Sequence, residues 1–226
     1  MRDNKTLNVL GCVPGLLNIL FELADESNGI QDFQVIKNIP VDSSKYFTNF
    51  KEWKVSFVEL SNTFKELSPE DLYALSVVGV DSKELVYNSF KKLVQMEDKQ
   101  FINLIHPSSY VSRSAELNYG LQIEQLTSVS ACTKIGFGVN IKRNCSIGHH
   151  CTIGDFATIN PGVTLSGMVK IGHHTMIGSG TTVKDGITIG ENSIIGVGSV
   201  VVKDIPNNSI AFGNPCVVHK INDKKS

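Results

Sequence analysis

The chain has 226 residues, 41% of them hydrophobic, and a formal net charge of −1 at pH 7, a length that fits one or two domains. This balance lacks the global basic field that nucleic-acid binding requires. Because no apolar run approaches the roughly 20 residues of a membrane span and the start lacks a signal-peptide core, we expect a cytoplasmic protein without membrane insertion.

The N-terminal part alternates predicted strands and helices. The pattern predicts strands at residues 6–10, 33–39, 55–60, 74–80 and 101–105, and helices at 14–27 and 82–96. This alternation is typical of an α/β fold, a small, mostly parallel, Rossmann-like sheet. Gly11 and Gly15 lie in the turn between the first strand and helix, where a helix N-terminus could hold a phosphate. A plain strand-to-helix turn explains the two glycines equally well.

From residue 111 onward an aliphatic residue falls at every sixth position. The sixteen positions are Val111, Leu117, Ile123, Val129, Ile135, Ile141, Ile147, Ile153, Ile159, Leu165, Ile171, Ile177, Val183, Ile189, Ile195 and Val201. Helices repeat at 3.6 residues and strands at 2, so neither element alone explains this period. The period indicates a hexapeptide-repeat parallel β-helix, an all-β unit.

Two other positions of the hexad also follow a pattern. The second position is often glycine, which we expect to relax the backbone at each bend. The fifth position holds small or β-branched residues that fit the interior of a turn, among them Cys145 and Cys151, which we therefore interpret as packing residues. Five cysteines without a CxxC pair do not predict a disulfide framework.

The ends of the repeat set the expected domain boundaries. His106-Pro107 ends the first domain, and Pro206 followed by Gly213-Asn-Pro215 stops the coil. A β-helix end exposes unpaired strand edges, which a terminal segment has to cover. We expect an N-terminal domain at residues 1–106, the β-helix at 107–202 and a capping tail at 203–226.

Together these features resemble one branch of the hexapeptide acyltransferases. The match rests on the short Rossmann-like domain, the linking His-Pro, the uninterrupted repeat and the closing Pro-x-x-Ser-x-x-x-Gly-Asn-Pro motif. The branch includes sialic acid O-acetyltransferases and nucleotide-sugar N-acetyltransferases of the bacillosamine, perosamine and viosamine type. It implies a left-handed β-helix with three hexads per coil, and a homotrimer with acetyl-CoA between adjacent β-helices.

The function that the resemblance implies is acetyl-CoA-dependent N-acetylation. The substrate would be a 4-amino-4,6-dideoxy sugar linked to dTDP or UDP, used in bacterial surface-glycan biosynthesis, and bound at the N-terminal domain. No metal and no covalent acyl-enzyme is implied, because CoA is an adequate leaving group for direct attack by the amine.

The resemblance also implies roles for individual residues. His149, in the stretch from Ile147 to Asp155, matches a histidine base that takes a proton from the sugar amine as it attacks the thioester. Imidazole suits this step because its unperturbed pKa lies near physiological pH. Gly167 matches a position whose backbone N–H stabilises the oxyanion. Thr158 takes the place of a histidine that contacts the acetyl carbonyl, and can still donate a hydrogen bond.

Several residues depart from the family pattern. Gly148 stands where the family has the acid that orients the histidine, and His150 replaces a second acid. Lys142 replaces an Asn and would bring a positive charge to the substrate one corner away. In the first domain the Gly11–Gly15 loop lacks the family's histidine, and Asn38 stands where relatives hold the nucleotide base.

Three alternatives stay open at this point. An O-acetyltransferase of sialic-type sugars would not need a nucleotide pocket. The changes at Gly148 and Thr158 fit a non-catalytic nucleotide-sugar-binding or scaffold protein. The pairs His149-His150 and His173-His174 invite a zinc site shared between subunits, as in γ-type carbonic anhydrases, although the tail and the first domain favour the acetyltransferase.

Overall fold

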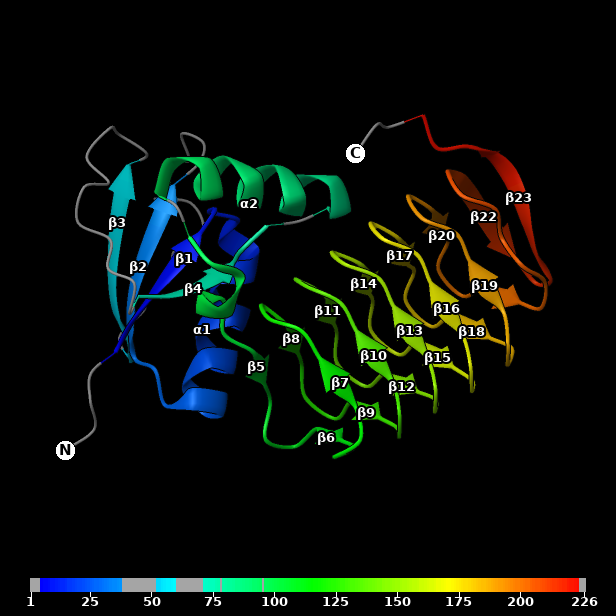
Figure 1. Cartoon of the computed structure of the whole chain (residues 1–226), viewed down its shortest axis with the longest axis horizontal. Coiled ribbons are helices and arrows are strands. Elements are labelled where there is room, and N and C mark those ends of the chain that lie inside the picture. Colours follow the sequence, from blue (N-terminus) through cyan, green and yellow to red (C-terminus); the bar gives the residue numbers. More distant parts are fainter. Residues whose placement is uncertain (1–4, 38–51, 60–70, 78, 95, 224–226) are drawn as a thin grey trace. The chain divides into compact units, whose positions relative to one another are not determined.

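The computed structural model describes residues 5–37, 52–59, 71–77, 79–94 and 96–223. The chain divides into two compact units, Met1–Leu104 and Ile105–Ser226 (Figure 1). Asn38 and the end of the second predicted strand lie outside the described residues. No helix within the described ranges is long and apolar enough to cross a membrane.

The first unit contains a four-stranded, fully parallel sheet in the order β3-β2-β1-β4. The strands are β1 (Thr6–Leu10), β2 (Asp32–Lys37), β3 (Lys54–Glu59) and β4 (Leu72–Leu75), and the helices are α1 (Pro14–Asn28), α2 (Val80–Val94) and the 3-10 helix η2 (Asp98–Gln100). Phe21 of α1 stacks on Phe33 of β2 with the ring centroids 4.2 Å apart, and both are fully buried. The apolar residues from which the first three strands and α1 were predicted therefore pack together in one core.

The last two strands predicted for this sheet differ from the structure. Strand β4 ends at Leu75, because the chain turns at Gly79 (φ 90°) directly into α2. The prediction that residues 101–105 form a fifth strand of this sheet is wrong. Phe101 makes a single parallel bridge to Tyr73, whereas Leu104–Ile105 forms β5, the first strand of the β-helix. Ile105 lies six residues before Val111, so the repeat begins one hexad earlier than predicted.

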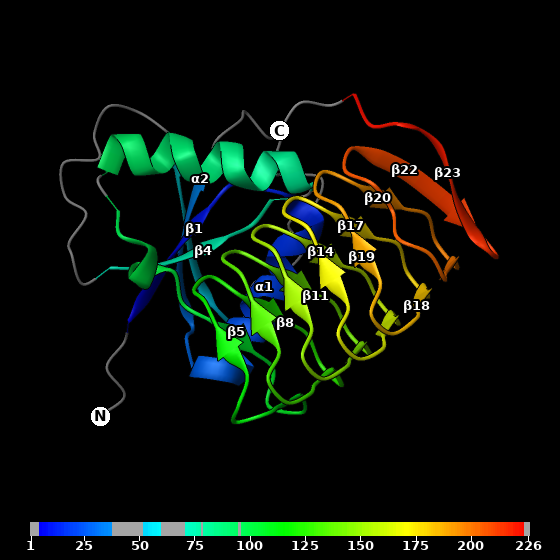
Figure 2. The ribbon, with the colours of Figure 1, turned by 45° about the vertical axis from the view of Figure 1, so that its right-hand side comes forward.

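The second unit is a β-helix of two-residue strands (Figure 2). After β5, the strands are β6 (Tyr110–Val111), β7 (Glu116–Leu117), β8 (Gln122–Ile123), β9 (Ser128–Val129), β10 (Lys134–Ile135), β11 (Asn140–Ile141), β12 (Ser146–Ile147), β13 (Thr152–Ile153), β14 (Thr158–Ile159), β15 (Thr164–Leu165), β16 (Lys170–Ile171), β17 (Met176–Ile177), β18 (Thr182–Val183), β19 (Thr188–Ile189), β20 (Ile194–Ile195) and β21 (Val200–Val201). They form three parallel sheets, containing β5-β8-β11-β14-β17-β20, β6-β9-β12-β15-β18-β21 and β7-β10-β13-β16-β19. Strand partners such as Lys134 and Thr152 are 18 residues apart, which confirms three hexads per coil.

The aliphatic first positions fill the interior as predicted. From Ile123 to Val201 each is at most 3% exposed. The fifth positions are buried too, and their hydroxyl and thiol groups donate to backbone carbonyls of the next coil. Examples are Thr133 Oγ1 to the oxygen of Gly148 at 2.8 Å and Cys151 Sγ to that of Ser166 at 3.2 Å. Burial raises the pKa of the Cys145 thiol to about 11, as expected for a packing residue.

The second-position glycines have a different cause from the predicted one. None of these glycines has a positive φ. A Cβ at Gly172 would lie 2.3 Å from the backbone nitrogen of Glu191 in the next coil, so glycine is required by close approach of neighbouring coils. The left-handed residue of each bend is instead the fourth of the hexad. At this fourth position even residues with bulky side chains adopt the left-handed conformation, such as Leu126 (φ 58°), His150 (φ 56°) and Phe156 (φ 57°).

The tail closes one sheet of the β-helix. Strand β22 (Ser209–Gly213) pairs in parallel with β20, and β23 (Cys216–Ile221) pairs antiparallel with β22. Because β23 runs in the opposite direction, the coiling pattern stops there. Ile205 adds one parallel bridge to Ile189 on another sheet.

Candidate functional site

His149 and Gly167 lie on the same corner of the β-helix in successive coils. His149 follows β12 and Gly167 follows β15, and these strands are hydrogen-bonded neighbours. We call the row of turns after β9, β12 and β15 the His149 corner. The coils are joined there by hydrogen bonds, including that from Met168 N to the oxygen of His149 at 2.8 Å. The structure therefore brings together two of the predicted site residues.

The imidazole of His149 packs directly against the backbone of Gly167. A Cβ added at Gly167 would lie 2.7 Å from both Cε1 and Nε2 of that ring, so no side chain fits there without moving it. The His149 ring is exposed to solvent. Within the described residues the N–H of Gly167 donates to no protein acceptor. An exposed base and a free backbone donor thus lie side by side.

Gly148 leaves no room for the acid that the family pattern expects. A Cβ at this position would lie 2.5 Å from the carbonyl carbon and oxygen of Ser166. On the other side of His149, the Nδ1 atoms of His149 and His150 lie 3.1 Å apart, a hydrogen-bonding distance. The two rings meet edge to face, at an interplanar angle of 86°.

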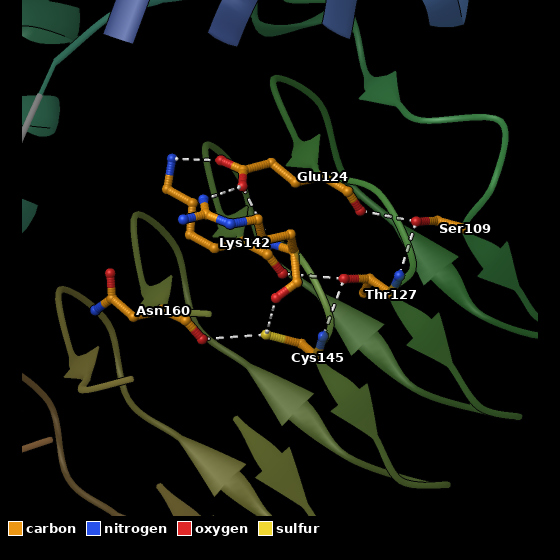
Figure 3. Close-up of polar contacts among 7 residues, drawn as sticks. Ser109, Glu124, Thr127, Lys142, Cys145 and Asn160 are labelled. Atoms are coloured by element: carbon orange, nitrogen blue, oxygen red, sulfur yellow. Dashed lines mark hydrogen bonds and ion pairs between the residues drawn. The ribbon is translucent and has the colours of Figure 1, made fainter. Parts of the chain in front are cut away.

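Lys142 lies on a different corner and is held by an acid (Figure 3). Its Nζ lies 3.0 Å from Glu124 Oε1, one coil earlier, and Arg143 Nη1 lies 3.3 Å from Oε2. The Glu124 side chain is only 3% exposed and that of Lys142 16%. Thr127 Oγ1 donates to the oxygen of Lys142 at 3.0 Å, which ties this turn to the coil before it. Lys142 is thus a partner of a buried carboxylate and not a residue held free for the substrate.

Thr158 belongs to neither of these corners. It lies on β14, in the sheet that contains β8, β11 and β17, and its N–H donates to Thr175 O at 2.9 Å. Within one chain, the structure does not bring Thr158 to the His149 corner.

A surface groove of about 410 Å³ follows the third corner, which includes the turns after β10 and β13. Its lining includes Lys134, Gly136, Asp155 and His173. Each turn here is capped from the next coil, because Phe137 N donates to Asp155 Oδ1 (2.7 Å) and Asp155 N to His173 Nδ1 (3.1 Å). These side chains satisfy backbone groups of the turns, and the groove is not at the His149 corner. No three His, Cys, Asp or Glu side chains in the described ranges form a metal-binding group.

In the first unit, Gly11 follows β1 at the carboxyl end of the sheet. Its φ of 90° and the 2.9 Å that would separate a Cβ from Ser76 O both require glycine. Gly15 lies in the first turn of α1, and a Cβ there would meet nothing within 4 Å, so close packing does not explain that glycine. Beside Gly11, the buried Ser76 Oγ has no hydrogen-bond partner among the described residues.

Glu124, Ser76 and the contact of His150 with His149 were not predicted from the sequence. Glu124 lies one coil of 18 residues before Lys142, and this spacing could have identified the pair. Ser76 lies inside the strand predicted at residues 74–80 and directly after β4 in the structure, and one polar residue in an apolar run is a weak signal. The orientation of His150 has no comparable signal, since it depends on the left-handed turn.

The repeat itself is recognised by sequence. The family described as bacterial transferase hexapeptide (six repeats) matches residues 132–167 and 168–203. Residues 132–203 of the β-helix therefore match hexapeptide repeats of the bacterial transferase type. No curated protein matches the sequence of the chain.

Solved structures match nearly the whole chain. The acetyltransferase domain of PglB from Neisseria gonorrhoeae, in complex with acetyl coenzyme A, is 25% identical over 96% of this chain and 100% of that chain, with a TM-score of 0.80. PerB from Caulobacter crescentus, in complex with CoA and GDP-perosamine, is 22% identical over 96% and 98%, with a TM-score of 0.79. WeeI from Acinetobacter baumannii is 18% identical over 95% and 100%, with a TM-score of 0.77. The similarity thus extends over both units.

Proposed function

We propose that the chain is an acetyl-CoA-dependent N-acetyltransferase that acts on a nucleotide-linked amino sugar. The observation that carries this proposal is the contact between His149 and Gly167. It places an exposed imidazole next to a backbone N–H that donates to no acceptor among the described residues. Acyl transfer needs a base for the nucleophile and a donor for the oxyanion. PglB and PerB, which bind acetyl-CoA or CoA, support the same reaction class.

In the proposed reaction the sugar amine attacks the carbonyl carbon of the acetyl thioester. His149 Nε2 takes the proton that the nitrogen loses, and the Gly167 N–H stabilises the oxyanion. The tetrahedral intermediate then collapses, the carbon–sulfur bond breaks, and the CoA thiolate leaves and takes the proton from His149. The products are the N-acetylated sugar and CoA.

We assign the nucleotide to a Rossmann-like domain, which the sequence predicts at residues 1–106 and which ends before β5. The strand order β3-β2-β1-β4 supports this, because connections diverge between β1 and β4, and ligands of open α/β sheets bind at such a point. Gly11 and Ser76 lie there, and Gly15 opens the adjacent helix. The expected sugar is a 4-amino-4,6-dideoxyhexose of surface-glycan synthesis, carried by dTDP, UDP or GDP in the cytoplasm.

The β-helix, which the sequence predicts at residues 107–202 and which begins at β5 in the structure, would be left-handed, with residues 203–226 as its cap, within a homotrimer. Thr158 and Lys142 lie away from the His149 corner in one chain. In the proposed homotrimer a neighbouring copy would bring them to it, and the active site would lie between subunits.

The test is to supply acetyl-CoA with dTDP-, UDP- and GDP-linked amino sugars and to follow free thiol. We expect one of them to be turned over, His149→Asn to lose most of kcat/KM, and the exposed His219→Asn, on β23, to keep it. Full activity of His149→Asn would refute the assignment of the base. Acetylation of a sialic-type hydroxyl instead would favour the O-acetyltransferase, and nucleotide binding without any acetyl transfer the non-catalytic alternative.

A further inference from the structure

His149 has a close neighbour that can replace the missing acid. In an imidazole base, the group bound to one nitrogen decides whether the other nitrogen is free to take a proton. The backbone of Ser166 occupies the space where a side chain at Gly148 would lie. An orienting group for His149 therefore has to come from elsewhere on the corner.

The contact with His150 has the required geometry. The Nδ1 atoms of the two rings lie 3.1 Å apart, and the backbone N–H of His150 is fixed by a 2.9 Å hydrogen bond to Ala131 O. The left-handed backbone at residue 150 (φ 56°) is shared by the fourth residue of the neighbouring hexads, so the corner itself sets the direction of this side chain.

We propose that His150 is the residue that positions His149 and selects its reactive tautomer. Its Nδ1 accepts the Nδ1–H of His149, which leaves Nε2 of His149 without a proton beside Gly167. When Nε2 takes the proton of the sugar amine, the Nδ1–H stays on His149 and His150 stays neutral. This inference rests on the proposed function, but the tautomer of His149 can be observed without any substrate.

The chain offers matched substitutions for the test. The Nδ1 of His and the Oδ1 of Asn or Asp are both attached to Cγ, so His150→Asn and His150→Asp keep an acceptor in the same place. His150→Leu removes it. The backbone accepts these residues, because Leu126 (φ 58°) and Asn144 (φ 59°) occupy the same hexad position. His174→Leu is the control, since His174 (φ 54°) is also a fourth residue but on another corner.

We expect His150→Leu to lower kcat about tenfold with KM for both substrates unchanged, because the reactive tautomer is no longer selected. His150→Asn and His150→Asp should stay within about threefold of the wild type, and so should His174→Leu. A role in side-chain packing would not be rescued by Asn and Asp, whereas a role in the left-handed backbone, which Asn and Asp also tolerate, is distinguished by the tautomer of His149. A kcat within twofold for His150→Leu, or Asn and Asp variants no better than Leu, would overturn the proposal.

Nitrogen-15 NMR of the imidazoles provides the readout that does not depend on activity. In the wild type at neutral pH we expect Nδ1 of His149 to carry the proton and Nε2 to be bare, and in His150→Leu a mixture of the two tautomers. A His149 protonated on Nε2 in the wild type would refute the inference even if the enzyme is active. The expected spectrum in a protein that transfers no acetyl group would leave the inference standing and refute the proposed function alone.

Discussion

Replacing Gly167 by Ala tests whether the observed packing of His149 matters for chemistry. The added Cβ would lie 2.7 Å from Cε1 and Nε2, whereas ordinary contact begins at 3.4 Å, so the ring has to move by about 0.7 Å. Misplacement of a reacting group by roughly 1 Å can cost about 100-fold in rate. We expect kcat to fall roughly 10- to 100-fold, which corresponds to about 1.4–2.7 kcal/mol. The backbone N–H remains, so the loss would come from the ring.

Stability should hardly change in Gly167→Ala. The backbone of Gly167 does not have a positive φ and the colliding group is an exposed side chain, so the free energy of unfolding should change by less than about 1 kcal/mol. Gly172→Ala is the contrasting control, because its Cβ would meet the backbone of Glu191 at 2.3 Å and should destabilise the fold without lowering the rate per folded molecule.

Steady-state kinetics and chemical denaturation measure the two effects. If the loss acts through His149, the double variant with His149→Asn should be no slower than His149→Asn alone. A Gly167→Ala enzyme with kcat within twofold of the wild type would show that His149 does not pack on Gly167 during turnover.

Other predictions concern the coils around the site. Glu124→Gln leaves Lys142 without its counter-charge, and should lower the free energy of unfolding by roughly 3 kcal/mol, with partial recovery on adding Lys142→Met; an unchanged denaturation midpoint would contradict the buried pair. Thr133→Val removes a buried hydroxyl that donates at 2.8 Å, and should cost about 1–3 kcal/mol by the same assay, against less than about 0.5 kcal/mol for the exposed Thr164→Val. Because burial raises the pKa of Cys145 to about 11, its thiol ionises first in the unfolded chain, near pH 8.5. Stability should therefore be intact below about pH 8.5 and fall as the pH rises towards 11; a Cys145→Ala variant with the same fall would assign it to other groups.

The sequence predicts the β-helix well because an aliphatic side chain faces the interior at every sixth position. Ile123, Ile135 and Ile147 lie on three different sheets of the β-helix, and each is buried at a first position. The same rule could have found Ile105, but the adjacent His106-Pro107 favoured a domain junction. The predicted role of the second-position glycines, to relax the backbone at each bend, was wrong. Gly148 is required because the backbone of Ser166 in the next coil lies close to it, and a contact between coils cannot be read from the sequence of one bend.

The site was less predictable than the fold. His149 and Gly167 were identified by resemblance, and the structure places them together because they are 18 residues apart. The contact between His149 and His150 depends on a left-handed backbone at residue 150, and nothing in a histidine at that position signals such a conformation. The pairing of Lys142 with Glu124 likewise became visible only once the coil length was known.

The β-helix obeys two different sequence spacings. Burial of the aliphatic side chains requires a multiple of six residues, whereas stacking on one corner requires a multiple of 18, as the pairing of Ser146 with Thr164 shows. Inserting one extra hexad between His150 and Leu165 would keep every aliphatic residue inside but rotate Gly167 to the next corner. An insertion of three hexads would restore the corner but place the two residues two coils apart instead of one. Tolerance of the scaffold to insertions and retention of the active site are thus separate properties, which can be engineered independently.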